Sequence, residues 1–251
     1  MSGSLSVTAL VTARDRPRLL EDALVSIARQ IPAPVEVRLT DTGETSAPFL
    51  DTWKRLLPLV VHEAPGLRAA QARNRAARGS RGDVLAFLDD DDRWRPDHLA
   101  GLVAAFASSA TQLAFRDCAV IRERILGDGA REDLDRRDIA RDWDEALMKS
   151  DDFLPPSAWG VRRSLFERLG GFDPSFRFSD DWDFLLRAAR VTRPTRVPGV
   201  TAEIRMREGG NASADFGPER LADLRLLEAR HGLPRLEPKT FWEVAETVAA
   251  Q

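Results

Sequence analysis

Four consecutive aspartates, Asp89 to Asp92, are the residues of this chain best suited to chemistry. They directly follow an all-apolar run, Val84 to Leu88, which predicts a buried strand. Neighbouring carboxylates repel one another, by roughly 1 kcal/mol per pair at about 4 Å in water and by more near a protein surface. A divalent cation turns this repulsion into attraction, and Mn2+ or Mg2+ needs few protein ligands because water and phosphate oxygens complete its shell. The run therefore predicts a site for Mn2+ or Mg2+.

A simpler alternative is a solvated acidic loop in which Asp92 caps the helix that begins near Pro96. Acidic surface runs are common, but few of them stand at the end of an all-apolar strand. Asp89 and Asp91 are also two residues apart, which is the spacing of a D-x-D motif. We therefore favour the cation site over the helix cap.

A second acidic pair, Asp180 and Asp181, opens a predicted helix over residues 180–190. A carboxylate can take a proton from an attacking hydroxyl, so this pair is a candidate for general-base chemistry. A neighbouring carboxylate raises the pKa of such a base and a helix N-terminus lowers it, and the sequence alone leaves that balance open. The alternative is an ordinary helix N-cap pair.

Strands and helices alternate over about the first 110 residues, and they must position these acids. Strands are expected over residues 6–12, 35–40, 59–62 and 84–88, and helices over residues 17–30 and 68–78. Such alternation predicts an α/β fold with a mostly parallel sheet flanked by helices. Ligands of open α/β sheets bind at the carboxyl ends of strands, so the residues after Thr12, Thr40 and Leu88 are where a site is expected.

The second half has a less regular pattern. We expect strands over 113–122 and 201–206, and helices over 163–169, 180–190, 221–231 and 240–250. Residues 126–149 are dense in charge, and we interpret them as a mobile arm or a solvated helix.

Composition narrows the class of protein further. The 251 residues, 43% of them hydrophobic, suit one α/β domain with an appended segment. A net charge of −3 gives no reason to expect a nucleic-acid partner. Cys118 is the only cysteine, which suits a reducing compartment, and no stretch approaches the roughly 20 apolar residues that cross a bilayer. We expect a cytoplasmic protein without a transmembrane segment, able to contact the inner face of the membrane peripherally.

Five segments carry a family resemblance through most of the chain. In chain order they are SVTALVTARDRPRLLEDALVSIARQ, EVRLTDTGETS, GLRAAQARNRAARGSRGD, VLAFLDDDDRWRPDHL and RRSLFERLGGFDPSFRFSDDWDFLLRAAR. Together they resemble the family 2 glycosyltransferases of the GT-A fold, which are mostly inverting. The resemblance is strong to about residue 190 and weaker beyond it.

The resemblance implies roles for the residues of the acidic motifs. Asp91 is the best metal ligand, Asp89 binds the metal or the ribose, and Asp90 lies beside them on the nucleotide sugar. Asp181, in a sequence similar to the family's Glu-Asp-Trp signature, is the implied general base, with Asp180 beside it.

Other positions are implied to bind the nucleotide sugar. These are Thr12, Ala13 and Asp15 for base and ribose, Asp41 for the base, and Arg73 for base or phosphate. Thr42 and Glu44 replace the usual acid and serine of the turn at Asp41, so the choice among UDP, GDP and TDP donors stays open. The family's late histidine is also missing here; Arg205 or Arg207 is expected to cover the phosphates instead, and Glu208 is a less favoured ligand.

The resemblance therefore implies a metal-dependent, inverting glycosyltransferase of the hexosyltransferase type. The donor is a nucleotide-diphosphate sugar, and the acceptor hydroxyl belongs to an unidentified glycan, lipid-linked or small molecule. We assign residues 1–215 to the GT-A domain, with a nucleotide-sugar half to about 112 and an acceptor half from about 113, and residues 216–251 to a C-terminal helical segment.

Two alternatives stay open. One is a catalytically inert nucleotide-sugar-binding module, since Thr42 and the missing histidine depart from the family pattern. The other is a nucleotidyltransferase, which is disfavoured because the segment after the first strand, ARDRP, is basic but contains no glycine.

Overall fold

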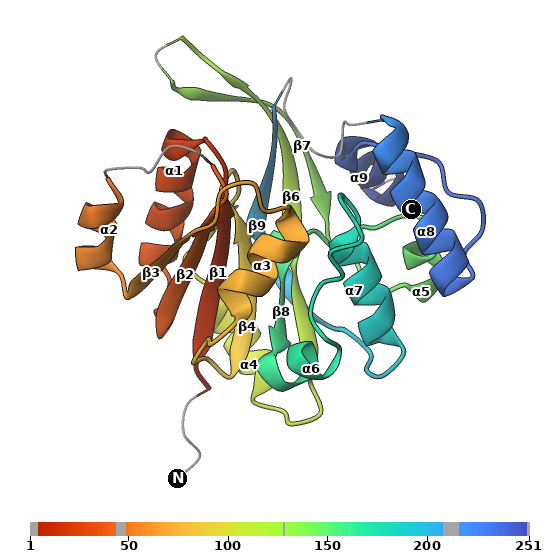
Figure 1. Ribbon diagram of the computed structural model, residues 1–251, viewed down its shortest axis with the longest axis horizontal. Helices are drawn as coiled ribbons and strands as arrows, with labels where there is room; N and C mark the ends of the chain where they lie inside the picture. Colours follow the sequence, from red (N-terminus) through yellow and green to blue (C-terminus); the bar gives the residue numbers. More distant parts are fainter. Residues whose placement is uncertain (1–4, 44–48, 128, 208–215, 250–251) are drawn as a thin grey trace.

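The computed structural model of the protein describes residues 5–43, 49–127, 129–207 and 216–249. Its N-terminal part alternates strands and helices, as the sequence predicts (Figure 1). The elements are β1 (Val7–Ala13), α1 (Pro17–Ala28), β2 (Glu36–Asp41), α2 (Leu50–Leu56), β3 (Leu59–Glu63), α3 (Ala69–Ala77), β4 (Val84–Asp89), β5 (Arg93–Trp94) and α4 (His98–Phe106).

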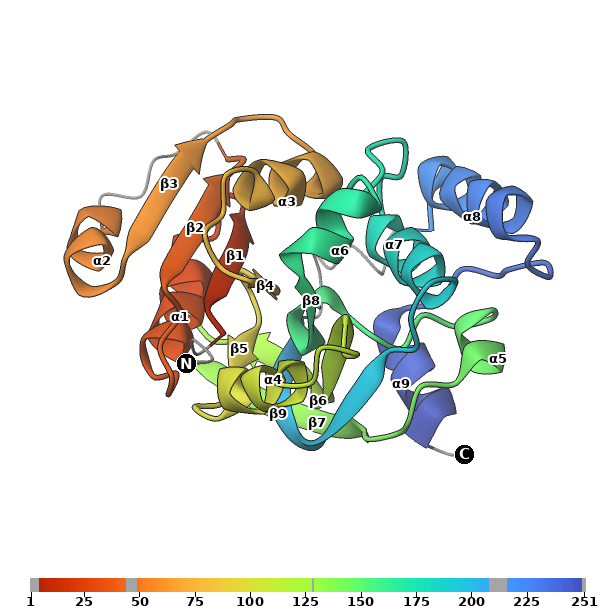
Figure 2. The same cartoon turned by 90° about the horizontal axis from the view of Figure 1, so that it is seen from below.

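The first four strands are parallel and lie in the order β3-β2-β1-β4. Their register places Thr12 of β1 beside Thr40 of β2 and Asp89 of β4. Helices α1 and α3 lie on opposite faces of this part of the sheet, which explains why β1 and β4 are buried along almost their whole length (Figure 2). The carboxyl ends of β1, β2 and β4 therefore meet at one edge, where the sequence predicts the site.

The second half adds strands of both directions. Its elements are β6 (Leu113–Ile125), β7 (Arg131–Ile139), α5 (Glu145–Met148), a short 3₁₀ helix (Pro156–Ala158), β8 (Trp159–Arg162), α6 (Arg163–Arg168), α7 (Asp180–Ala189), β9 (Thr195–Arg207), α8 (Pro218–His231) and α9 (Phe241–Ala249). The sheet continues from β4 as β8-β6-β9-β5, with β7 paired to β6. Strand β8 is antiparallel to both its neighbours, whereas β6 and β9 are parallel. The fold is α/β as predicted, but the expectation of a mostly parallel sheet holds only for β1 to β4, and the whole sheet is mixed.

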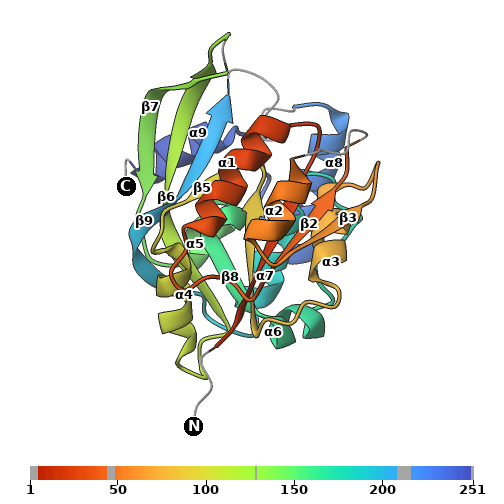
Figure 3. The ribbon, with the colours of Figure 1, turned by 90° about the vertical axis from the view of Figure 1, so that its left-hand side faces the viewer.

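The prediction of a mobile arm or a solvated helix over residues 126–149 is wrong for residues 131–139, which form strand β7. Strand β7 pairs with β6 in an antiparallel hairpin. Cys118 pairs with Ile139 at one end of the ladder and Ile125 pairs with Arg131 at the other, and α5 follows the hairpin. The hairpin protrudes from the body of the molecule in both Figure 1 and Figure 3. Most of β7 is exposed or half-buried, so its side chains lack the apolar alternation that would reveal a strand. Pairing of the backbone with the long strand β6 decides the conformation instead.

Five aromatic rings form the core between the sheet and helices α6 and α7. They belong to Phe87, Trp159, Phe166, Phe172 and Phe184. Trp159 and Phe184 stack with their ring centroids 5.6 Å apart, which fixes α7 against β8. Among the described residues, no helix is both long enough and apolar enough to span a bilayer.

Candidate active site

A cavity of about 960 Å³ opens at the carboxyl ends of the parallel strands. Its walls come from distant parts of the chain: the ends of β1 and β4, helix α3, the N-terminus of α7, and the segment that carries α8 and α9. The lining includes most of the residues that the sequence singles out, namely Thr12, Ala13, Asp15, Arg73, Asp89, Asp90, Asp91, Asp180 and Asp181. The fold therefore brings both acidic motifs to one cavity.

The four aspartates of the acidic run differ in exposure. The side chains of Asp89 and Asp91 are 29% and 16% exposed, whereas Asp90 and Asp92 are buried. Asp92 accepts hydrogen bonds from the Ser157 hydroxyl at 2.6 Å and from the Arg205 amide at 3.0 Å. It therefore does not cap α4, which rules out the simple loop interpretation for that residue. The two carboxylates available to the cavity are the first and third of the run.

Two arginines contact the carboxylate of Asp91. Arg207 donates to its Oδ2 at 2.8 Å, and Arg16 donates to the same oxygen at 2.5 Å while also pairing with Asp90. Burial raises the pKa of Asp90 to about 7, and the Arg16 guanidinium opposes that rise. Of the two arginines expected near the phosphates, Arg207 lies at the acidic run, whereas Arg205 is bound by Glu123 and other acids beneath it.

Arg73 joins the two acidic motifs. Its side chain is 9% exposed, and it donates to both carboxylate oxygens of Asp89 at 3.0 and 3.1 Å and to Asp180 at 2.9 Å. The charges of these two acids hold the arginine in place, although burial alone would disfavour its charge. Arg73 thus fixes the end of β4 relative to the N-terminus of α7.

The two acids at the start of α7 have different environments. Asp180 is buried against Arg73, and burial raises its pKa to about 7 while Arg73 opposes the rise. Asp181 is half-buried at the cavity, and its carboxylate accepts a hydrogen bond from the Trp182 amide at 2.9 Å. Burial also raises the pKa of Asp181, opposed first by Arg73. Because the side chain of Asp180 is 1% exposed whereas Asp181 is half-buried at the cavity, Asp181 is the acid better placed to meet a substrate.

The end of β1 forms another part of the cavity wall. The Thr12 hydroxyl donates to Asp89 at 3.2 Å, and Asp15 has a left-handed backbone with φ of 51°. A Cβ added to Gly43 would lie 2.3 Å from the Asp15 carboxylate, so the close approach of residue 43 to Asp15 needs a glycine. Asp41 is buried and accepts a hydrogen bond from the Gly43 amide, and it does not line the described part of the cavity, whereas its neighbour Thr42 does. The predictions at Glu44 and Glu208 fall outside the described residues.

Several residues lining the cavity escaped the sequence analysis. Asp152 faces the same space as Asp181, and burial together with the Asp181 charge raises its pKa well above the usual range. Arg220 of α8 donates to the Ser179 hydroxyl at 3.0 Å. Leu224 and Phe241 add apolar surface from the C-terminal helices. Only the acidic pair at 151–152 gives any signal in the sequence, since the others resemble ordinary helix residues.

The carboxylates at the cavity can supply some of the oxygen ligands that a hard divalent cation needs. Asp89 and Asp91 supply carboxylate oxygens at the cavity, which are ligands that Mg2+ and Mn2+ prefer. In the described part of the chain, no three His, Cys, Asp or Glu side chains are grouped so as to hold a metal ion. Two carboxylates are sufficient for an ion that completes its shell with phosphate oxygens and water.

Comparisons with known proteins point to one family. The model of the family described as "Glycosyl transferase family 2" matches residues 8–170. The uncharacterized glycosyltransferase YwdF of Bacillus subtilis (strain 168) is 28% identical over 239 residues, which cover 94% of this chain and 88% of that protein.

Two solved structures share the fold. A fragment of S. aureus TarS in complex with UDP-GlcNAc aligns with a TM-score of 0.68 and 16% identity, over 97% of this chain and 71% of that one. The mannosyltransferase PcManGT from Pyrobaculum calidifontis, in complex with GDP-Man and Mn2+, aligns with a TM-score of 0.64 and 20% identity, over 99% of this chain and 70% of that one. At these identities the likeness is one of architecture.

Proposed function

This chain belongs to glycosyl transferase family 2 and is a glycosyltransferase, and we propose that it moves a sugar from a nucleoside-diphosphate donor to an acceptor hydroxyl with inversion at the anomeric carbon. The observation that carries the proposal is the shared cavity of Asp89, Asp91 and Asp181. All three carboxylates are half-buried and line this cavity, but Asp89 and Asp91 come from the end of β4 and the loop after it, whereas Asp181 comes from the start of α7. Such a division suits a donor and an acceptor that meet between the two motifs.

The donor half is proposed to lie along the ends of β1 and β4. Thr12, Ala13 and Asp15 would hold the base and ribose. Asp41, also proposed for the base, is buried beside Ala13 in the sheet and would act from behind them. Asp91 and Asp89 would hold Mn2+ or Mg2+, which when bound would neutralise the charge of the departing nucleoside diphosphate. The structural relative that was solved with GDP-Man and Mn2+ supports this proposal. Arg16 and Arg207 already lie at Asp91, so their guanidinium groups are within the region where the phosphates would bind.

The acceptor half is proposed to centre on Asp181. Its carboxylate would take the proton from the acceptor hydroxyl as that oxygen attacks the anomeric carbon and the bond to the diphosphate breaks. The raised pKa of Asp181 favours this transfer, because a stronger base takes a proton more readily. The carboxylate is ionised, and so able to accept the proton, at pH values above its pKa. A single attack with a single base inverts the anomeric configuration.

We also propose that residues 216–251 complete the acceptor half, beyond the GT-A domain of residues 1–215. Leu224 of α8 and Phe241 and Val244 of α9 line the cavity on the side of α7. Aromatic and aliphatic side chains beside carboxylates suit the faces and hydroxyls of a sugar or the apolar part of a larger acceptor.

Two substitutions test the assignment of the two halves. Asp91→Ala should abolish the thermal stabilisation that UDP or GDP gives together with Mn2+, since a ligand stabilises the fold only while it binds. Asp181→Asn should keep that stabilisation and lower sugar transfer by about 10²- to 10⁴-fold, the usual contribution of a general base. Asp142→Asn changes an acid that is 84% exposed and serves as the control.

The measurements are thermal midpoints with nucleotide and Mn2+, and release of nucleoside diphosphate from UDP- and GDP-sugars. Full activity in Asp181→Asn would disprove the base assignment. Unchanged Mn2+-dependent stabilisation in Asp91→Ala would disprove the metal site.

A further inference from the structure

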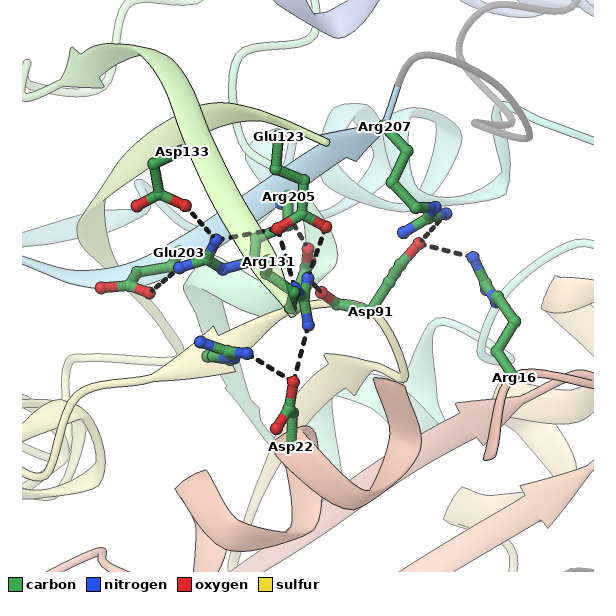
Figure 4. A network of polar contacts seen from close by, with 11 residues as sticks. Arg16, Asp22, Asp91, Glu123, Arg131, Asp133, Glu203, Arg205 and Arg207 are labelled. Atoms are coloured by element: carbon green, nitrogen blue, oxygen red, sulfur yellow. Dashed lines mark hydrogen bonds and ion pairs between the residues drawn. The ribbon is translucent and has the colours of Figure 1, made fainter. Parts of the chain in front are cut away.

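A network of ion pairs, buried at its centre, lies beside Asp91 of the acidic run (Figure 4). At its centre is Glu123 of β6, whose side chain is 0% exposed. Arg131 of β7 donates to both Glu123 carboxylate oxygens, from Nε at 2.8 Å and from Nη2 at 2.7 Å. Arg205 of β9 donates to the same carboxylate at 2.8 Å. The turn end of the hairpin, where Glu123 and Arg131 lie, is thus held by charge-assisted hydrogen bonds rather than by apolar packing alone.

One guanidinium in this network reaches the acidic run itself. Nη2 of Arg131 also donates to the backbone carbonyl oxygen of Asp91 at 3.1 Å. Its remaining Nη1 donates to Asp22 of α1 at 3.0 Å, and Asp22 pairs with Arg93 of β5 as well. Arg131 therefore connects the hairpin, helix α1 and the loop after β4 through a single side chain that is 8% exposed.

We propose that Arg131, oriented by Glu123, is a positioning residue that sets Asp91 for binding the cation and the diphosphate. This inference rests on the proposed role of Asp91 as a metal ligand. Arginine presents five donors in a rigid planar fork, so the bidentate bond to Glu123 fixes where Nη2 points, and Nη2 in turn fixes the Asp91 carbonyl. The charge of Arg131 is paired and shielded from water, which keeps the side chain from leaving its place.

Two substitutions should loosen this support without touching the ligand. Arg131→Lys keeps the charge but cannot bond Glu123 on both oxygens and Asp91 at once. Glu123→Gln keeps the shape but leaves Arg131 without its buried anion. Both should weaken Mn2+ binding by roughly tenfold, since residues that orient metal ligands typically change metal affinity by 10- to 100-fold when replaced.

Asp22→Asn is the matched control within the same network. It removes a partner of Arg131 that is 38% exposed and leaves the bonds to Glu123 and to the Asp91 carbonyl in place. It should lower the thermal midpoint without changing Mn2+ affinity by more than about twofold. A merely structural role for Arg131 predicts instead that all three variants lose stability and none loses affinity.

The experiment titrates Mn2+ into the full chain in the presence of UDP and, separately, GDP, with free Mn2+ followed by electron paramagnetic resonance. Thermal midpoints and circular dichroism report folding in parallel. Weaker Mn2+ binding in Arg131→Lys and Glu123→Gln, but not in Asp22→Asn, supports the proposal, and wild-type affinity in a folded Arg131→Lys or Glu123→Gln variant overturns it. Asp91→Ala separates the two proposals: if it binds Mn2+ as tightly as wild type, the metal site itself is wrong, whatever the hairpin variants do.

Discussion

At the scale of single residues, neighbouring aspartates of identical chemistry differ in what surrounds them. Asp90 pairs with Arg16, and Asp92 is buried against Ser157. Asp89 and Asp91 retain exposed carboxylate surface beside their arginine partners. Since solvation and neighbouring charges set the behaviour of a carboxylate, only two of the four are suited to meet a ligand.

Asp181 is likewise defined by the charges that face it. Arg73 and Arg220 lower its pKa, whereas burial and the charge of Asp89 raise it, and Asp152 is a further carboxylate of the same cavity. The net pKa is raised, so in the proposed mechanism Asp181 would become protonated, and transfer would be lost, at a higher pH than with an ordinary aspartate as the base.

Arg220→Gln should move the acid limb of the activity profile to higher pH. The substitution removes a cation that lowers the pKa of Asp181, so the base becomes protonated sooner as the pH falls. Arg220→Lys keeps the positive charge and should leave the limb near its wild-type position. Activity measured from pH 5 to 9 checks this, with the exposed Arg193→Gln as control; an unchanged limb in Arg220→Gln would show that the arginine does not act on Asp181.

At the scale of elements, α3 and the turn before α7 are joined by one side chain. The Asn74 amide donates to the Phe172 carbonyl at 2.7 Å, and its oxygen accepts from the Phe172 amide at 3.0 Å. A Cβ added to Gly171, which has φ of 72°, would lie 2.5 Å from that oxygen. Asn74 thus holds the approach to α7 beside the Arg73 bridge between the two motifs.

Asn74→Ala should lower the free energy of unfolding by about 1–3 kcal/mol, because two backbone groups of Phe172 lose their partners. Gln112→Ala removes a comparable bond at an exposed site and should cost less than about 0.5 kcal/mol. Urea denaturation of the two variants measures the difference. Equal, small losses in both would mean that water replaces the Asn74 contacts.

At the scale of the whole molecule, stability depends on the protonation of buried acids. Burial raises the pKa of Asp180 to about 7, above the roughly 3.9 of an aspartate in the unfolded chain. Between these two values the folded state binds more protons than the unfolded state, so the contribution of Asp180 to the free energy of unfolding falls as pH rises. Burial lowers the pKa of His98 well below its usual value. Below about pH 6.5, the contribution of His98 to the free energy of unfolding therefore rises as pH rises.

Asp180→Asn isolates this contribution, because the other titrating groups are common to both proteins. Between pH 6 and pH 8 the free energy of unfolding of the wild type should fall by about 1 kcal/mol relative to the variant. Urea midpoints at several pH values give the comparison. A difference that stays constant, or that grows in favour of the wild type at high pH, would show that Asp180 remains ionised through its pair with Arg73.

Local sequence determined the elements that carry the site. The apolar runs ending at Ala13 and Leu88 form buried parallel strands, and the carboxyl ends of such strands meet at one edge whatever the details of packing. The acidic residues that follow them were therefore identifiable as candidates without a structure, and family membership was readable from the order of the segments.

Only the tertiary structure decided which acids face the cavity and what surrounds them. The exposure of Asp91 and the burial of Asp92 depend on Arg207, Arg205 and Ser157, which lie 65 or more positions away in the chain. The sequence pattern predicted a strand over residues 113–122, within β6, but it did not indicate β7 or the hairpin, because the charged residues of the hairpin pair with one another across elements. Such contacts between distant residues leave no local periodicity, since they follow from the packing of the whole chain.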